Sequence, residues 1–167
     1  MNVEAFPNNH VFGLTSLGPQ GIIDKAYNAL EPSLRITDRF DPNINYKNDG
    51  TLLVRKDDWY DRIYNEKTQR PASPMETNTW YEVWMVVNNQ KKAEGGQVYD
   101  VYIRGGSEFP TQQKVYSKAD FRMKREVPII YFSATCNTGS KEQPYGNGGL
   151  RYDDLYMTSG VELGSPL

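Results

Sequence analysis

Two neighbouring segments, residues 80–89 and 97–106, carry tryptophan, tyrosine and arginine side chains among carboxylates. This combination suits sugar recognition, because a flat aromatic ring packs against the C–H face of a pyranose while charged side chains hydrogen-bond its hydroxyl groups. Arginine also holds a carboxylate or sulfate group through two parallel hydrogen bonds. The candidate sugar-binding residues in these segments are Glu82, Trp84, Tyr102 and Arg104.

The same two segments are rich in β-branched and aromatic residues and are joined by a polar stretch that contains glycine, which predicts an antiparallel hairpin. Side chains alternate between the two faces of a strand, so one face is apolar and the other carries the sugar-binding candidates. The predicted apolar face consists of Tyr81, Val83, Met85, Val87, Tyr99, Val101 and Ile103. The predicted mixed face consists of Trp80, Glu82, Trp84, Val86, Asp100, Tyr102 and Arg104.

The two indoles of the mixed face admit two interpretations. Exposed indoles gain nothing in water unless something covers them, so a ligand groove is one interpretation. The other is a curved sheet that is buried on both faces, with Arg104 in a structural ion pair. For Trp84 the ligand groove and the buried sheet both stay open. Trp80 begins its strand, and we expect it in the core.

Further candidates come from other segments. If the neighbouring strands follow the usual sandwich order, Arg35, Arg55 and Tyr131 join the mixed face. An aromatic floor flanked by several arginines would suit an anionic polysaccharide, such as a uronan or a sulfated galactan. Trp59 is a candidate at a loop or sheet edge, although one residue of the adjacent pair Trp59 and Tyr60 is expected to pack inside.

The rest of the chain positions these residues in an all-β domain. Its 167 residues include 12 tyrosines, 14 glycines and 10 prolines, and short apolar runs alternate with turn residues. This pattern predicts a single domain, residues 1–167, built as a two-sheet antiparallel β-sandwich or jelly roll of roughly ten strands. Besides the hairpin, strands are expected within 10–17, 33–39, 51–55, 57–64, 114–123, 128–135 and 150–157, and a loop or strand within 22–30.

Charge and composition limit the classes of binding partner that we expect for this chain. The formal net charge of −2 argues against nucleic acid or an anionic membrane as the main partner, but it leaves room for a local basic groove. The single cysteine, Cys136, rules out an internal disulfide. No apolar run approaches the ~18 residues of a transmembrane helix, and no signal-peptide pattern is expected within these residues.

Two sequence runs resemble known domains. The run Trp80-Tyr-Glu-Val-Trp-Met-Val-Val, followed by Tyr99-Asp-Val-Tyr-Ile-Arg-Gly-Gly, resembles the paired central strands of laminin-G-like and concanavalin A-like jelly rolls. The run Gly148-Gly-Leu-Arg-Tyr-Asp-Asp-Leu-Tyr-Met157 is similar to the closing strand of many carbohydrate-binding modules. The resemblance covers mainly residues 33–163. It implies a secreted or cell-surface bacterial jelly roll that binds polysaccharide as part of a larger multidomain enzyme.

The resemblance also implies a structural calcium ion. In such modules an aspartate of the closing strand binds Ca²⁺ together with an acidic residue near the N-terminus, and the matching residues here are Asp154 and Glu4. Asp153 and Asp154 alternate between faces, so both cannot reach one ion. The alternative is that one is exposed and the other caps a loop.

Catalytic patterns are weak. Jelly-roll glucanases carry alternating acids on one strand, whereas Glu82 stands between Trp80 and Trp84. A polysaccharide lyase would need a tyrosine or histidine base and a group that neutralises the uronate, roles for which Tyr102, Arg104 and Tyr131 are available. The only histidine, His10, opens a strand and is expected to be packed or hydrogen-bonded. We therefore predict no catalytic residue and favour a binding module, with a small lyase and a protein-interaction or adhesion domain as alternatives.

Overall fold

The predicted hairpin forms two strands of a three-stranded sheet in the computed structural model, which describes residues 1–42, 45–142 and 144–164. This antiparallel sheet has the order β10–β11–β12. Its strands are β10 (Tyr81–Asn88), β11 (Val98–Gly105) and β12 (Phe109–Asp120). The 3-10 helix η2 (Lys92–Glu94) lies in the connection between β10 and β11. The register pairs Glu82 with Arg104 and Trp84 with Tyr102, which confirms the predicted mixed face.

A second antiparallel sheet has five strands in the order β13–β2–β3–β6–β7. They are β13 (Tyr131–Cys136), β2 (Asn9–Thr15), β3 (Ser33–Thr37), β6 (Leu52–Lys56) and β7 (Trp59–Arg62). The short pair β4 (Phe40–Asp41) with β5 (Tyr46–Lys47) lies between β3 and β6, and the pair β8 (Tyr64–Asn65) with β9 (Arg70–Pro71) lies between β7 and β10.

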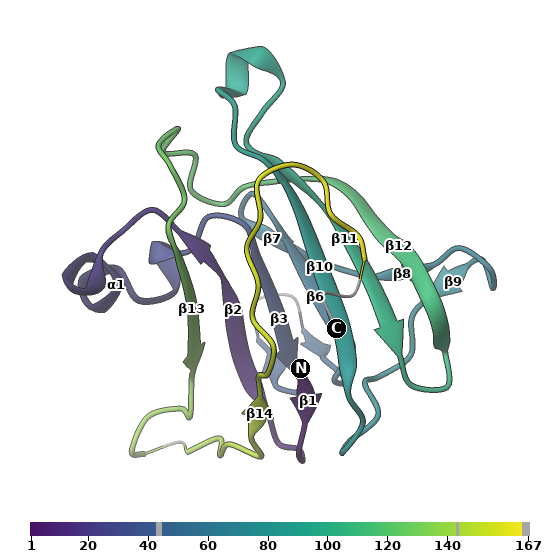
Figure 1. Ribbon diagram of the computed structural model, residues 1–167. Coiled ribbons are helices and arrows are strands. Elements are labelled where there is room, and N and C mark those ends of the chain that lie inside the picture. Colours follow the sequence, from purple (N-terminus) through teal and green to yellow (C-terminus); the bar gives the residue numbers. More distant parts are fainter. Residues whose placement is uncertain (43–44, 143, 165–167) are drawn as a thin grey trace.

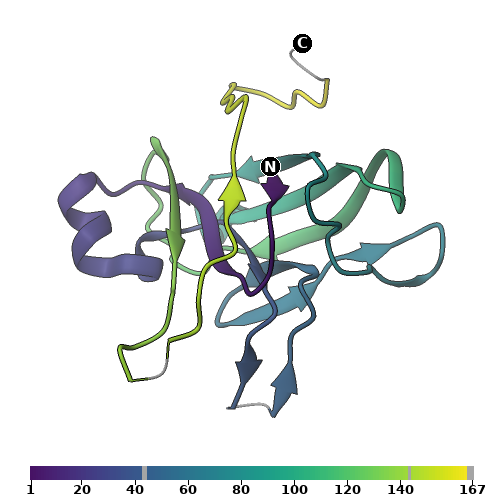
Figure 2. The same ribbon diagram turned by 90° about the horizontal axis from the view of Figure 1, so that it is seen from below.

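The two sheets stack face to face, as Figure 1 and Figure 2 show, and the core lies between them. Alternation directs every second side chain of each strand into this layer. The five-stranded sheet contributes Leu34, Ile36, Leu52 and Val54, and the three-stranded sheet contributes Tyr99, Val101 and Ile103. The predicted all-β sandwich is confirmed, while the jelly-roll topology that the resemblance implies stays a prediction.

Two expectations about local structure are wrong. The segment predicted as loop or strand within 22–30 contains the helix α1 (Pro19–Lys25), followed by the 3-10 helix η1 (Ala26–Ala29). Proline is favoured at the first helical position, because its fixed φ suits a helix start. The predicted strand 150–157 is limited to β14 (Leu150–Arg151), since its partner β1 (Asn2–Val3) is equally short.

Residues 152–164 continue beyond β14 over the outer face of the three-stranded sheet (Figure 1). The Gln112 side-chain amide donates a hydrogen bond of 2.7 Å to the Leu163 carbonyl oxygen. The Trp84 indole N–H donates a 3.4 Å bond to the Gly164 carbonyl oxygen. The C-terminal segment therefore covers part of the mixed face.

Candidate functional site

A hollow of about 1020 Å³ lies on the outer face of the five-stranded sheet, and we call it the groove. Residues of β2, β3, β6, β7 and β13 line it, together with the segments that follow α1, β12 and β13. Its charged lining consists of four arginines and two aspartates: Arg35, Arg55, Arg62, Arg122, Asp41 and Asp58. The groove is therefore basic, although the whole chain has a net charge of −2.

Strand alternation explains why these arginines meet. On β3, Leu34 and Ile36 enter the core, so Arg35 faces outward. On β6, Leu52 and Val54 are buried, which turns Arg55 to the same outer face. The register between β6 and β7 then places Tyr60 opposite Arg55 and Arg62 opposite Leu53.

The Tyr60 ring lies close to two guanidinium groups. The Arg35 guanidinium carbon is 5.1 Å from the Tyr60 ring centroid, and that of Arg55 is 4.6 Å away, both within the range of cation–π attraction. Burial raises the pKa of Tyr60, and the two positive charges only partly oppose that shift. The phenol is therefore neutral at ordinary pH and acts as a packed, polar floor.

Hydrogen bonds fix both of these arginines. Nε and Nη2 of Arg35 donate to the Asn9 side-chain oxygen at 3.1 and 2.8 Å. Burial lowers the pKa of Arg35, but an arginine guanidinium stays protonated in proteins. Nε of Arg55 donates to the Asp57 carbonyl oxygen at 2.7 Å. These contacts leave other N–H groups of each guanidinium for the groove.

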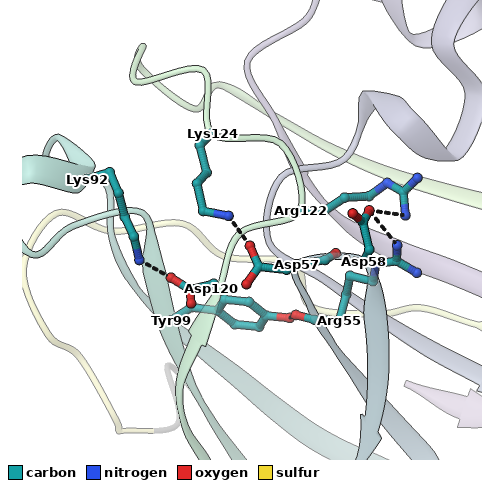
Figure 3. A network of polar contacts seen from close by, with 8 residues as sticks. All are labelled: Arg55, Asp57, Asp58, Lys92, Tyr99, Asp120, Arg122 and Lys124. Carbon is teal, nitrogen blue, oxygen red and sulfur yellow. Dashed lines mark hydrogen bonds and ion pairs between the residues drawn. The ribbon is translucent and has the colours of Figure 1, made fainter.

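Tyr99 supports this site from the core. It belongs to β11, yet its hydroxyl lies 2.6 Å from the Arg55 carbonyl oxygen on β6 (Figure 3). The same hydroxyl lies 2.7 Å from the Ser33 carbonyl oxygen on β3. The residue is buried, and burial raises its pKa well above the ordinary tyrosine value. One buried hydroxyl therefore joins the three-stranded sheet to the strands that carry Arg35 and Arg55.

The opposite wall of the groove comes from the segment after β12. Nε and Nη2 of Arg122 donate to the Asn28 side-chain oxygen at 2.9 and 2.5 Å, and the guanidinium lies 4.9 Å from the Tyr27 ring centroid. Arg125 holds the same helical connection, because it donates to the Asn28 and Ala29 carbonyl oxygens. The wall is thus built by contacts between segments far apart in the sequence.

The other end of the groove is ordered around Arg62. It forms an ion pair with Asp49 and donates to the Thr51 hydroxyl at 2.8 Å and the Tyr46 hydroxyl at 3.1 Å. Burial by itself would raise the pKa of Asp49, but hydrogen bonds from Thr51 and the Arg62 charge hold it below its usual value. Trp59 lies at the groove rim with 69% of its surface exposed, so its ring is available to a ligand.

The mixed face of the hairpin lies on the opposite outer surface of the sandwich. Glu82 forms an ion pair with Arg104, and the Lys114 ammonium lies 5.1 Å from the Tyr102 ring centroid. Trp84 is partly buried. Trp80 is 50% exposed, so the expectation that it belongs to the core is wrong.

The predicted site residues therefore divide between two surfaces. The structure brings Arg35, Arg55 and Trp59 together in the groove. It places Glu82, Trp84, Tyr102 and Arg104 on the other sheet. The expectation that Arg35 and Arg55 join the hairpin is wrong, because β3 and β6 belong to the opposite layer. Tyr131 begins the edge strand β13 opposite Thr15, and it belongs neither to the groove lining nor to the mixed face.

Sequence reasoning did not identify Arg62, Arg122 or Tyr27 as groove residues. Arg62 could have been found from alternation on β7, once β7 was paired with β6. Arg122 lies in an irregular segment and Tyr27 in a 3-10 helix of four residues, which is too short for a periodic pattern to indicate which way its side chain points.

The predicted calcium ligands lie at the β1–β14 end of the molecule. Glu4 forms an ion pair with Arg151, and Asp154 is exposed, with its backbone N–H donating to the Asp153 carboxylate at 3.0 Å. Within the part of the chain that the structure describes, no group of three or more acidic, histidine or cysteine side chains could hold a metal ion.

His10 is packed and hydrogen-bonded, as expected. Its Nδ1 lies 2.5 Å from the Asn8 side-chain oxygen, and burial lowers its pKa. Burial also raises the pKa of the Cys136 thiol, which lines the groove beside β2.

Among the described residues, no helix combines the length and the apolar character needed to cross a membrane.

A scan against protein-family models finds no match to this chain, and searches of curated proteins and of solved structures find none either.

Proposed function

We propose that this protein is a non-catalytic polysaccharide-binding domain and that its ligand is an acidic glycan held in the groove. The observation that carries the proposal is the gathering of four arginines around an aromatic floor on a chain of net negative charge. The four arginines outnumber the two aspartates of the lining, and an excess of one sign of charge in a cleft attracts ligands of the opposite sign. Guanidinium groups suit carboxylates and sulfates in particular, because their N–H groups match two oxygen atoms at once.

The arrangement of the groove supports a sugar polymer rather than a free anion. Trp59 and Tyr27 offer exposed rings at its rim, and Tyr60 with the neighbouring Arg35 and Arg55 forms a floor. Its volume of about 1020 Å³ lies at the upper end of the range for small-molecule pockets, about 300–1,000 Å³. An open groove of this size accommodates several linked sugar rings.

The resemblance to carbohydrate-binding modules extends this proposal. A secreted jelly-roll module of this kind holds a catalytic domain close to its polysaccharide, and its benefit is a raised effective concentration. In this proposal the partner of the domain is a uronan or a sulfated galactan, and the domain forms part of a larger bacterial enzyme.

The proposal is tested by affinity electrophoresis through gels that contain polygalacturonate, alginate, carrageenan or neutral agarose alone. The protein should be retarded by at least one acidic glycan and not by agarose alone, and added salt should weaken the retardation because screening reduces the ionic contribution. Equal migration in every gel would reject the proposal.

A polysaccharide lyase is the second candidate, and the observation that favours it is a tyrosine ring close to two arginines in the groove. The residues first considered for this role, Tyr102, Arg104 and Tyr131, lie on different sheets. The pKa of Tyr60 is raised, which is unfavourable for a base at neutral pH. New absorbance from unsaturated sugar ends, on incubation with the same uronans, would replace the binding proposal with the lyase.

An interaction or adhesion domain is the third candidate, and half-exposed Trp80 of the mixed face favours it. It would gain support if no acidic glycan retarded the protein.

A structural calcium ion at Glu4 and Asp154 also stays a prediction. It is tested by comparing the melting temperature in EDTA with that in Ca²⁺.

A further inference from the structure

Asp58 lies between two arginines that come from different parts of the chain. Its Oδ1 is 3.5 Å from Nη2 of Arg55 on β6 and 3.9 Å from Nη1 of Arg122 after β12 (Figure 3). All three residues line the groove. A single carboxylate therefore faces two positive charges at the position where the two walls approach each other.

The two arginines are rigidly held and largely withdrawn from solvent. Only 8% of the Arg55 side chain and 14% of the Arg122 side chain are exposed. Each guanidinium rests on a tyrosine ring and donates its Nε–H to a fixed oxygen atom, of Asp57 and Asn28 respectively. Their positions are thus set without the help of Asp58.

Asp58, in contrast, is loosely held. Its side chain is 85% exposed, and both contacts are longer than the roughly 2.7–2.9 Å of a strong charge-assisted hydrogen bond. Because the carboxylate is exposed and its contacts are long, we expect these two ion pairs to contribute little stability, so another anion can compete with Asp58. The geometry resembles a receptor for an acidic group that the chain fills weakly with its own carboxylate.

We infer that Asp58 is an internal counter-ion, and that a carboxylate or sulfate group of an acidic glycan displaces it from between Arg55 and Arg122. This inference rests on the proposed function and names the anion subsite within the groove. Neutral sugars cannot compensate for the displaced carboxylate. Asp58 therefore raises the selectivity of the groove for glycans that bring an acidic group of their own.

The neighbouring residue Asp57 offers a matched control. Its carboxylate pairs with Lys124 and not with either arginine of the subsite (Figure 3). Asp57→Asn and Asp58→Asn remove the same charge from adjacent positions, so they have the same effect on the net charge of the protein. Only Asp58→Asn should vacate the anion subsite.

The experiment measures the Kd of wild type, Asp58→Asn and Asp57→Asn for oligomers of galacturonate, for oligomers of carrageenan and for neutral agarose oligomers. We expect Asp58→Asn to bind an acidic oligomer about three- to tenfold more tightly than wild type, because it lacks the competing carboxylate. Asp57→Asn should stay within about twofold of wild type. The two acidic oligomers show whether the subsite takes a carboxylate or a sulfate group.

Two outcomes of this comparison would overturn the inference. If both variants bind more tightly by the same factor, net charge explains the effect and the subsite does not. If Asp58→Asn binds an acidic oligomer no better than wild type does, Asp58 is not a competitor of the ligand.

A second measurement separates the failure of this inference from that of the proposed function. Sodium sulfate is titrated against each variant at constant ionic strength, and the melting temperature is followed. General salting effects act alike on all three proteins, but a vacant anion subsite gives Asp58→Asn an additional, saturable increase. If no glycan binds, that increase still supports the subsite, whereas equal responses of all three proteins overturn it.

Discussion

The hydroxyl oxygen of Tyr99 lies 2.6 Å from the backbone carbonyl oxygen of Arg55, although the two residues belong to different sheets. This contact crosses the core of the sandwich and ends at the strand that carries the groove arginine. The floor of the groove is therefore linked directly to the packing of the two layers.

Replacing Tyr99 with phenylalanine should lower the free energy of unfolding by about 1–3 kcal/mol, because the buried carbonyl oxygens of Ser33 and Arg55 lose the single hydroxyl proton that they share. Urea denaturation measures the change. Tyr131→Phe is the control, since this exposed ring should give a change within about 0.5 kcal/mol. Equal effects of the two substitutions would show that the Tyr99 hydroxyl does not join the sheets.

Replacing Arg125 with methionine should destabilise the fold by about 3–5 kcal/mol, because a buried carboxylate would lose its cation. That carboxylate belongs to Glu31, which is fully buried and lies 3.2 Å from Nη1 of Arg125. Adding Glu31→Gln to the variant should restore part of the loss. A double-mutant cycle by urea denaturation tests this, and strictly additive effects would contradict the predicted coupling.

Much of the fold could be predicted from the sequence, because the alternation of apolar and polar side chains along a strand depends only on neighbouring residues. The two faces of the hairpin were predicted correctly from period-two patterns. The partners of β3 and β6 were not, since sheet membership depends on contacts distant in sequence. That is why Arg35 and Arg55 were assigned to the wrong surface, and why Arg122, which follows β12 in an irregular segment, was not predicted at all.

The protein should lose stability as the pH falls below about 6.5, the ordinary histidine pKa. Burial lowers the pKa of His10, so the unfolded chain takes up its proton at a higher pH than the folded protein does. The stabilising contribution is therefore complete above the unfolded pKa and disappears as the pH falls through the folded one. Melting temperatures between pH 7.5 and 5 should decline less steeply in His10→Gln, and identical slopes would contradict this role.

Gly13→Ala should destabilise the pairing of β2 with β3 by about 1–3 kcal/mol, the usual range for overpacking. A Cβ atom at Gly13 would lie 2.2 Å from the Pro32 carbonyl oxygen, which belongs to rigid backbone. Gly18→Ala provides the control, because among the described residues no atom beyond its immediate chain neighbours lies within 4 Å of the added Cβ. A Gly13→Ala protein that melts at the wild-type temperature would contradict the close approach.

The location of the ligand is tested most directly by two matched substitutions, Trp59→Ala at the groove rim and Trp84→Ala on the opposite sheet. The measurement is affinity electrophoresis of both variants, beside wild type, against the acidic glycan that retards wild type most. Trp59→Ala should weaken binding by about tenfold or more, which corresponds to about 1.4 kcal/mol, and Trp84→Ala should migrate like wild type. Lost retardation in Trp84→Ala together with full retardation in Trp59→Ala would place the ligand on the hairpin and contradict the groove.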